Sequence, residues 1–194
     1  MRARKQALPS IQEAMEVSSP LTVHSLVERA ANGDAEAFRE LFERYADRVY
    51  RYSHTRLRRP EDAQDATQDV FLAVWRGLSS FRYVHDGSFG GWVFAIARNI
   101  VAEHQRRSLR RPGVPMEEAM ADPVEFEGRL VDARLVGDEL DRLPETQREV
   151  LILRFVVGLR AREAGIALGK SEAAVMALQM RGLEQLRRRI GPER

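Results

Sequence analysis

The segment AREAGIALGKSEAAVMALQMR, residues 161–181, decides how the C-terminal part of this chain folds. Gly165, Gly169 and Val175 have the spacing of a helix-turn-helix. That motif needs a small residue where the helices cross, a glycine in the turn and an aliphatic anchor on the second helix, which enters the major groove of DNA. A helical hairpin with no role in DNA binding has the same spacing, so the motif alone leaves both interpretations open.

The sequence around this segment predicts further helices. Leu143-Pro144 turns the chain into a helix, and residues 160–168 form a short one. Ser171 caps a last helix that runs to Arg189. The apolar residues that this part offers to the core are Val150, Leu151, Leu153 and Phe155.

The N-terminal half predicts a helical bundle. Apolar residues recur at spacings of three and four, and the pattern is interrupted at Asn32-Gly33, at Pro60 and in a loop at residues 81–91. We therefore expect four helices, the last of which starts near Trp92. The residues expected to face inward are Leu26, Val27, Ala30, Phe38, Leu41, Phe42, Tyr45, Val49, Tyr52, Ala66, Val70, Phe71, Val74, Trp75, Val93, Ile96, Ala97 and Ile100.

The remaining segments set the domain organisation. Residues 1–20 show no sustained period and are expected to form a disordered extension. Residues 108–129 are rich in proline and glycine and carry acidic side chains, which predicts a flexible acidic linker. The sequence contains no alternating run of β-branched residues between turns, so we expect no strand. The sequence therefore predicts an all-α protein of two small helical domains, 21–107 and 130–194, joined by this linker.

The composition excludes several classes of protein. The chain has 194 residues, with 31 Lys and Arg, 29 Asp and Glu, four His and no Cys. A disulfide scaffold, a thiolate zinc site and a cysteine nucleophile are therefore excluded. The apolar stretches are shorter than the ~20 residues of a membrane span. The first residues lack the apolar core of a signal peptide, so we expect a cytoplasmic protein without a membrane span.

The charges are unevenly distributed along the chain. Four arginines lie in residues 106–111 and three in residues 187–189, on either side of an acidic stretch at residues 116–128 that has no basic residue. This pattern favours two surfaces for anionic ligands, joined by a segment that avoids them. Solvated helix ends would account equally well for either basic cluster alone.

The helix after Pro60 carries an acidic face. Asp65 and Asp69 lie one turn apart on the same side of it. No histidine stands at ligand spacing, so a metal site is disfavoured, and an exposed acidic surface or a protein-docking face remains. The chain also lacks a glycine-rich phosphate loop and a nucleophile elbow. We therefore expect no enzyme, no cofactor and no metal.

Four aromatic residues fall within twelve positions: Phe81, Tyr83, Phe89 and Trp92. Aromatic rings beside arginine suit unstacked bases, because every base has a π-face and arginine binds the backbone. Core packing is the alternative, and we favour it for Trp92. For the loop positions we favour nucleic-acid binding.

Four segments, taken together, resemble an extracytoplasmic-function (ECF) sigma factor, the promoter-recognition subunit of bacterial RNA polymerase. They are AFRELFERY (37–45), EDAQDATQDVFLAVW (61–75), SFGGWVFAIARN (88–99) and LPETQREVL (143–151). The resemblance covers about residues 26–190. It implies a sigma-two-like helical domain, followed by the linker and a sigma-four-like helix-turn-helix domain.

The resemblance also implies site residues. The clamp of the polymerase would be bound by Asp65, Gln68, Asp69 and Phe71. The melted minus-ten strand would be bound by Phe81, Tyr83, Phe89, Arg98, Asn99, Glu103, Arg106 and Arg107. The minus-thirty-five element would be bound by Ser171, Glu172, Ala173, Met176, Gln179 and Arg181. Met176 stands where a cation is usual, which predicts a weaker and less salt-dependent grip on that element.

The function implied is an alternative sigma factor that binds core RNA polymerase and directs promoter recognition and transcription initiation, with melting by the first domain. Its expected partners are core polymerase, promoter DNA and an anti-sigma factor, and the free chain is expected to be a monomer. The alternative is a helix-turn-helix regulator that binds DNA by itself. It would need a dimerisation surface, and no heptad run or spare apolar helix supplies one.

Overall fold

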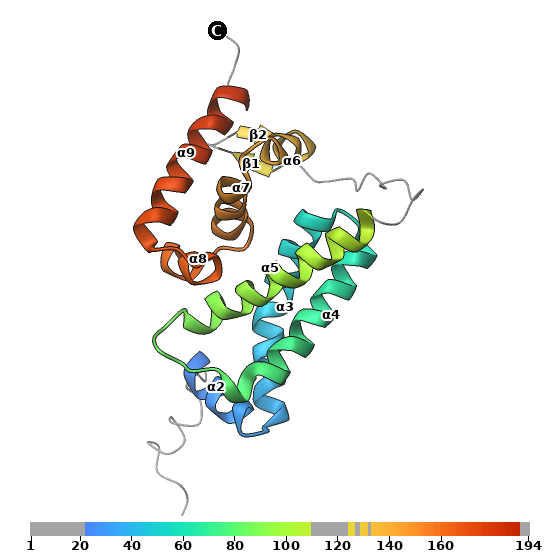
Figure 1. The fold of residues 1–194 in the computed structure, drawn as a ribbon, viewed down its shortest axis with the longest axis vertical. Helices are drawn as coiled ribbons and strands as arrows, with labels where there is room; N and C mark the ends of the chain where they lie inside the picture. Colours follow the sequence, from blue (N-terminus) through green and yellow to red (C-terminus); the bar gives the residue numbers. More distant parts are fainter. Residues whose placement is uncertain (1–21, 110–123, 127–128, 132, 191–194) are drawn as a thin grey trace, which may run out of the picture.

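The computed structural model describes residues 22–109, 124–126, 129–131 and 133–190. These residues form two helical units that lie side by side (Figure 1). The predicted all-α class with two small helical domains is confirmed. The extension predicted at residues 1–20 and most of the predicted linker lie outside the described residues. None of the described helices is both long and apolar enough to cross a membrane.

The N-terminal unit consists, in chain order, of α2 (Val23–Ala31), α3 (Ala35–Leu57), α4 (Pro60–Gly77), the short 3-10 turn η1 (Leu78–Ser80) and α5 (Ser88–Leu109). Helices α3, α4 and α5 pack on one another, and α2 lies across α3.

The C-terminal unit begins with an antiparallel pair of short strands, β1 (Val124–Phe126) and β2 (Arg129–Val131). Its helices are α6 (Ala133–Asp141), α7 (Glu145–Leu151), the π-helical turn η2 (Ile152–Val156), α8 (Ala161–Leu168) and α9 (Glu172–Ile190). Helices α8 and α9 form the predicted helix-turn-helix.

Local sequence sets the helix ends. Asp34 Oδ1 accepts hydrogen bonds from the backbone N–H groups of Glu36 (3.0 Å) and Ala37 (3.1 Å), which caps α3. Pro60 lies in the first turn of α4, where an N–H would have no partner within the helix. Gly169 ends α8 with φ of +62°, a left-handed conformation that glycine adopts without strain.

Apolar side chains of both units meet in one continuous core. Val49, Val70 and Phe94 of the N-terminal unit are fully buried in it, and so are Leu153 and Val175 of the C-terminal unit. A second, smaller cluster lies within the C-terminal unit and consists of Leu140, Leu143, Leu151 and Leu186. The shared core means that the two units pack against each other in this structure, a question that the sequence left open.

The contact between the units runs along α5 and α8. Gly91 permits it, because a Cβ atom at that position would lie 2.6 Å from Ile166 Cβ and 2.9 Å from the carbonyl oxygen of Glu163. Any side chain at residue 91 would push α8 away. The predicted start of this helix near Trp92 is wrong: α5 begins at Ser88, so the loop ends at residue 87. Gly90 and Gly91, two of the three glycines that indicated a loop, lie in the first turn of α5, and Gly91 serves close helix packing.

Other sequence expectations also need correction. The pair β1–β2 was not predicted, because three-residue strands are too short to show an alternating pattern. Phe155 was expected in the core and is 58% exposed. Phe42 and Trp75 were expected to face inward and are also exposed, at the rim of the bundle, where each contacts another aromatic ring.

Gly165 gives a first testable prediction. A Cβ atom at residue 165 would lie 2.6 Å from the carbonyl oxygen of Lys170. The backbone N–H of Lys170 also donates to the Gly165 carbonyl at 2.8 Å, so the turn is held close to the helix. Gly165→Ala should therefore lower the free energy of unfolding by about 1–3 kcal/mol through overpacking. Gly137→Ala in α6 is the control, since no atom lies within 4 Å of its Cβ position, and it should leave stability unchanged or raise it by up to ~1 kcal/mol. Urea denaturation measures both variants, and an equal change in the free energy of unfolding for Gly165→Ala and Gly137→Ala would contradict this account.

Asp34 gives a second prediction, on pH. The backbone N–H of Ala37 and then the side chain of Arg29 lower the pKa of Asp34 below its ordinary value of 3.8. The charged form is favoured in the folded state, so its stabilisation is complete above the ordinary pKa and is lost as pH falls through the folded pKa. Asn also caps helices, so Asp34→Asn should keep the cap and remove this loss.

The measurement is thermal unfolding of the parent and of Asp34→Asn between about pH 7 and pH 3. The gap in midpoint between the two proteins should narrow below about pH 4. Asp47→Asn is the control, because Asp47 lies on the exposed side of α3 and pairs only with Arg51. A gap that stays constant over the whole pH range would refute the linkage.

Candidate functional site

Helix α4 presents the predicted acidic face to solvent. Asp65, Gln68 and Asp69 are all exposed. Phe71 is only 6% exposed, and its ring packs against that of Phe42 at 4.6 Å between centroids, so the structure places it in the core rather than on this face. The predicted set is therefore reduced to its three polar members.

Sequence reasoning missed Leu72, which is 52% exposed. It lies three residues after Asp69 and seven after Asp65, so it belongs to the same stripe of α4. That spacing was the signal that could have identified it. Trp75 lies one turn after Phe71 and is also exposed, with its ring edge on Phe38. The acidic face thus has an apolar border.

A hollow of about 230 Å³ lies between α4 and α5 beside this face. His104 Nε2 lies 2.9 Å from Asp69 Oδ2 and ties the two helices together. The residues that line the hollow are Asp69, Leu72, Ala73, Arg76, Ile100, Glu103, His104 and Arg107. The described part of the chain holds no group of three or more Asp, Glu or His that could bind a metal ion.

The aromatic residues predicted to bind the minus-ten strand divide into two sets. Phe89 is 1% exposed and packs edge-on against Tyr45, so its ring is not available to a base in this arrangement, and its assignment is corrected to the core. Phe81 and Tyr83 are half-buried. Phe81 stacks on Trp92 at 4.6 Å between ring centroids.

Tyr83 is held from two sides. Its ring stacks on that of His24 at 4.4 Å, and its hydroxyl donates to Asp86 Oδ1 at 2.8 Å. Burial, and then the hydrogen bond to Asp86, raise the pKa of Tyr83 to about 12. The hydroxyl therefore remains protonated at neutral pH. The loop at residues 81–87 thus presents a fixed aromatic surface beside α5.

Most of the predicted DNA-binding residues of α5 are exposed to solvent, but Arg98 contacts the C-terminal unit. Asn99, Glu103, Arg106 and Arg107 are exposed, with Glu103 and Arg107 forming an ion pair. Arg106 makes no ion pair with any described residue. Arg98 is turned toward the C-terminal unit, and it donates to the Ala167 carbonyl at 2.8 Å and to Glu149 Oε2 at 3.2 Å. The structure therefore separates Arg98 from the other predicted DNA-binding residues of this helix.

The second helix of the helix-turn-helix offers its first turns to solvent. Ser171 Oγ accepts a hydrogen bond from the Ala174 N–H at 3.2 Å, which confirms the predicted cap of α9. The exposed members of the predicted set are Ser171, Glu172, Ala173, Met176 and Arg181. Gln179 is partly buried, because its Oε1 accepts a hydrogen bond from Arg154 Nε at 2.9 Å.

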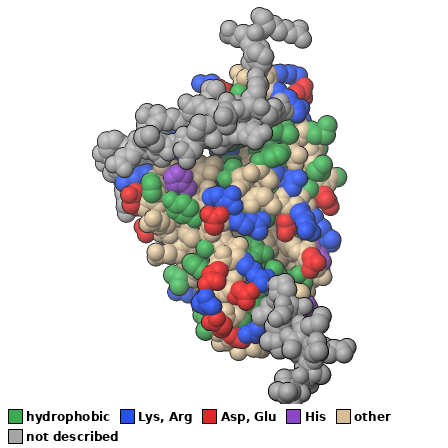
Figure 2. Space-filling view, turned by 180° about the vertical axis from the view of Figure 1, so that it is seen from behind, with side chains coloured by type: hydrophobic (Ala, Val, Ile, Leu, Met, Phe, Trp, Pro, Cys, Tyr) green, Lys and Arg blue, Asp and Glu red, His purple; other side chains and the backbone are tan. Residues whose placement is uncertain are grey.

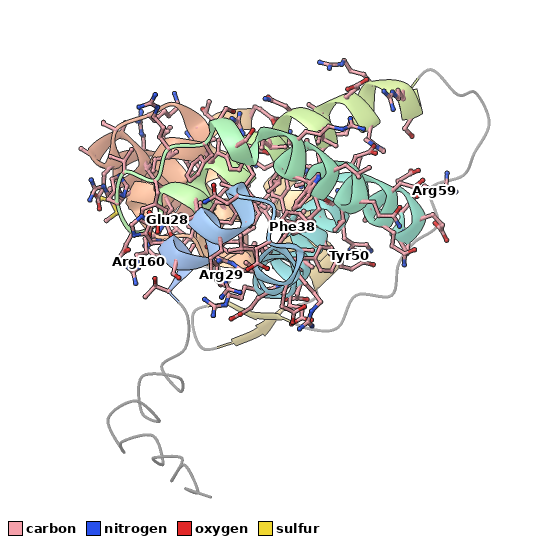
Figure 3. All side chains as sticks on the ribbon, turned by 90° about the horizontal axis from the view of Figure 1, so that it is seen from below. Glu28, Arg29, Phe38, Tyr50, Arg59 and Arg160 are labelled. Atoms are coloured by element: carbon pink, nitrogen blue, oxygen red, sulfur yellow. The ribbon has the colours of Figure 1, made fainter. Side chains whose placement is uncertain are left out.

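The charged side chains do not form one continuous patch on the face drawn in Figure 2. Figure 2 shows basic and acidic side chains interspersed over the face drawn there. Figure 3 shows Arg59, which precedes α4, and Arg160, which precedes α8, toward opposite ends of the molecule in that view. The acidic face on α4 and the helix-turn-helix are therefore separate surfaces, suited to different ligands.

Comparison with known proteins assigns both units. Residues 41–111 match the Sigma-70 region 2 family, and residues 133–186 match the Sigma-70 region 4 family. The chain is 41% identical over 180 residues to the ECF RNA polymerase sigma factor ShbA of Streptomyces griseus, an alignment that covers 85% of this chain and 93% of that protein.

Two further likenesses extend this result. The ECF RNA polymerase sigma factor BldN of Streptomyces coelicolor is 38% identical over 170 residues, which span 84% of this chain and 64% of BldN. The structure of CnrH in complex with the cytosolic domain of CnrY superposes with a TM-score of 0.66 at 27% identity, over 85% of this chain and 94% of CnrH. The chain belongs to the family of extracytoplasmic-function RNA polymerase sigma factors.

Proposed function

We propose that this protein is an alternative sigma factor that binds core RNA polymerase and directs it to promoters. The observation that carries the proposal is the order of the two sigma-70 regions along one chain, each with an exposed candidate binding surface. The polymerase would supply nucleotidyl transfer and the sigma factor would supply specificity, so the chain needs no catalytic residues. Its place of action would be the cytoplasm, where the polymerase meets chromosomal DNA.

The acidic face on α4 is the proposed polymerase contact. Asp65, Gln68 and Asp69 offer charge and hydrogen-bond acceptors, and Leu72 and Trp75 offer apolar area at the border. Such a mixture suits a basic partner surface with an apolar centre, because charge steers the encounter while apolar burial stabilises the complex.

Two surfaces are proposed for promoter DNA. Phe81 and Tyr83 with Asn99 and Arg106 would bind the melted minus-ten strand by stacking and backbone contacts. The first turns of α9 would lie in the major groove of the minus-thirty-five element. Met176 supplies no charge there, so this contact should be weaker and less dependent on salt than one with a cation at this position.

A protein inhibitor is a further proposed partner. CnrH was solved in complex with the cytosolic domain of CnrY. We infer that the present chain, expected to be a monomer by itself, also binds an anti-sigma factor that covers its polymerase-binding surfaces.

The polymerase contact is tested by charge reversal. Asp65→Lys together with Asp69→Lys should weaken binding to core RNA polymerase at least tenfold, because attraction at two positions becomes repulsion. Size-exclusion co-elution and titration of the labelled protein measure this. The control reverses Glu43 and Asp47, which are exposed on α3, and should bind as the parent does. A parent that forms no complex with core polymerase would favour the stand-alone DNA-binding regulator.

The minus-ten contact is tested by separating binding from melting. Replacement of both Asn99 and Arg106 by Ala should abolish open complexes while core polymerase is bound with unchanged affinity, because these residues lie on α5 and are not part of the acidic face of α4. Permanganate reactivity of promoter thymines reports melting. Arg39→Ala, an exposed position on α3, is the control. Loss of polymerase binding and melting together would contradict the assignment.

A further inference from the structure

A buried carboxylate joins the two units. Glu149 on α7 is 3% exposed, and every polar side chain that it contacts belongs to the N-terminal unit. Tyr52 donates its hydroxyl to Oε2 at 3.0 Å, Arg98 Nε lies 3.2 Å from the same oxygen, and Arg56 Nε lies 3.1 Å from Oε1. Glu149 therefore has its polar partners only while the units are closed on each other.

The surroundings keep this contact intact. Burial, and then the charge of Glu149, raise the pKa of Tyr52 well above its ordinary range, so its hydroxyl remains a donor. Only 9% of the Arg56 side chain is exposed, and it also pairs with Glu145 at 2.8 Å. A buried charge without its partner is costly, so the carboxylate and the two guanidinium groups hold one another in place.

Further contacts add to the closed arrangement. Arg48 Nε donates to the Val157 carbonyl at 3.0 Å, and Arg98 Nη1 donates to the Ala167 carbonyl. Gly91 lets α5 and α8 touch over the same interface. The fit is specific, since two arginines of the N-terminal unit meet backbone acceptors at the ends of η2 and α8.

The closed arrangement is incompatible with simultaneous contact to both promoter elements. Their names place them about 25 base pairs apart, which is roughly 85 Å at 3.4 Å per base pair. Helix α5 of the minus-ten surface and α8 of the helix-turn-helix are in direct contact here. The 14 residues from 110 to 123, between α5 and β1, can span at most about 50 Å when extended, and the lengths of the two units add to that reach, so the chain allows the units to separate.

We propose that the free chain is autoinhibited by this interface, with Glu149 as the latch that holds Arg98 and α5 against the helix-turn-helix unit. This inference rests on the proposed sigma-factor function for its biological meaning. Promoter recognition then requires the units to separate. A latch of this kind is reversible, because the desolvation of its ions offsets much of their attraction.

The latch is tested first in the full chain without polymerase. The chain has no cysteine, so Gln64→Cys on α4 and Ala177→Cys on α9, both exposed, carry a donor and an acceptor dye at defined places. The parent should show one high-transfer population. Glu149→Gln should increase the low-transfer, open population at least tenfold, and Glu149→Lys should increase it further.

Glu184→Gln is the matched control, because Glu184 is exposed on α9 and, among the described residues, pairs only with Arg188 of the same helix. It should behave as the parent does. Circular dichroism checks that the helices of every variant remain folded. An open distribution in the parent, or a closed one in both Glu149 variants, overturns the proposal.

The inhibitory role is tested by locking the interface. In the double variant Gly91→Cys, Ile166→Cys, the two Cβ atoms would lie 2.6 Å apart in the present arrangement, which is about 1 Å less than the 3.5–4.5 Å of a disulfide. Helices α5 and α8 must therefore move apart by about that distance for the bond to form. The oxidised protein should fail to support transcription by core polymerase, and reduction should restore it. Either single variant should be insensitive to oxidation.

The outcomes separate the two claims. Equal transcription by the oxidised and reduced forms overturns autoinhibition. No transcription by the parent and by the reduced double variant overturns the proposed sigma function and the inhibitory role with it, whereas the dye measurement still decides whether Glu149 closes the units.

Discussion

The burial of helix α5 on two sides is the constraint on which the rest of the structure depends. One side packs on α3 and α4, where the ring of Phe94 lies edge-on to that of Tyr52, and the other contacts α8 of the C-terminal unit. A helix in this position has room for polar residues only along the remaining strip and near its C-terminal end. Asn99 and Arg106 lie there, which is why the same helix can serve the core and still present the surface proposed for nucleic acid.

Small residues determine how closely the elements approach. Gly91 admits α8, Gly165 admits the turn of the helix-turn-helix, and Gly182 lies where a Cβ atom would be 3.0 Å from Leu151. Each sits inside a helix, where glycine lowers helix propensity by about 1 kcal/mol relative to alanine. Closer packing offsets that loss, since interiors are as dense as organic crystals and gain dispersion energy from each contact.

Charge has two separate roles in the molecule. On the surface, pairs such as Arg39 with Glu43 are exposed and contribute little to stability. Between the units, Glu149 and its arginine partners are buried, so their contribution depends on exact geometry and on the units remaining together. The first kind keeps the helices solvated, and the second joins the two units.

The sequence by itself determined the helices, the helix-turn-helix, the acidic face and the family, because periodicity, capping residues and motif spacing are local properties of the chain. Only the tertiary structure decided that Phe89 belongs to the core, that Leu72 and Phe155 are exposed, and that Arg98 faces Glu149 rather than solvent. A helical period tells which residues share a face but not how wide the buried sector is. That width depends on contacts with residues that are distant in the sequence. Arg98, for example, pairs with Glu149, which lies 51 residues further along the chain in the other unit.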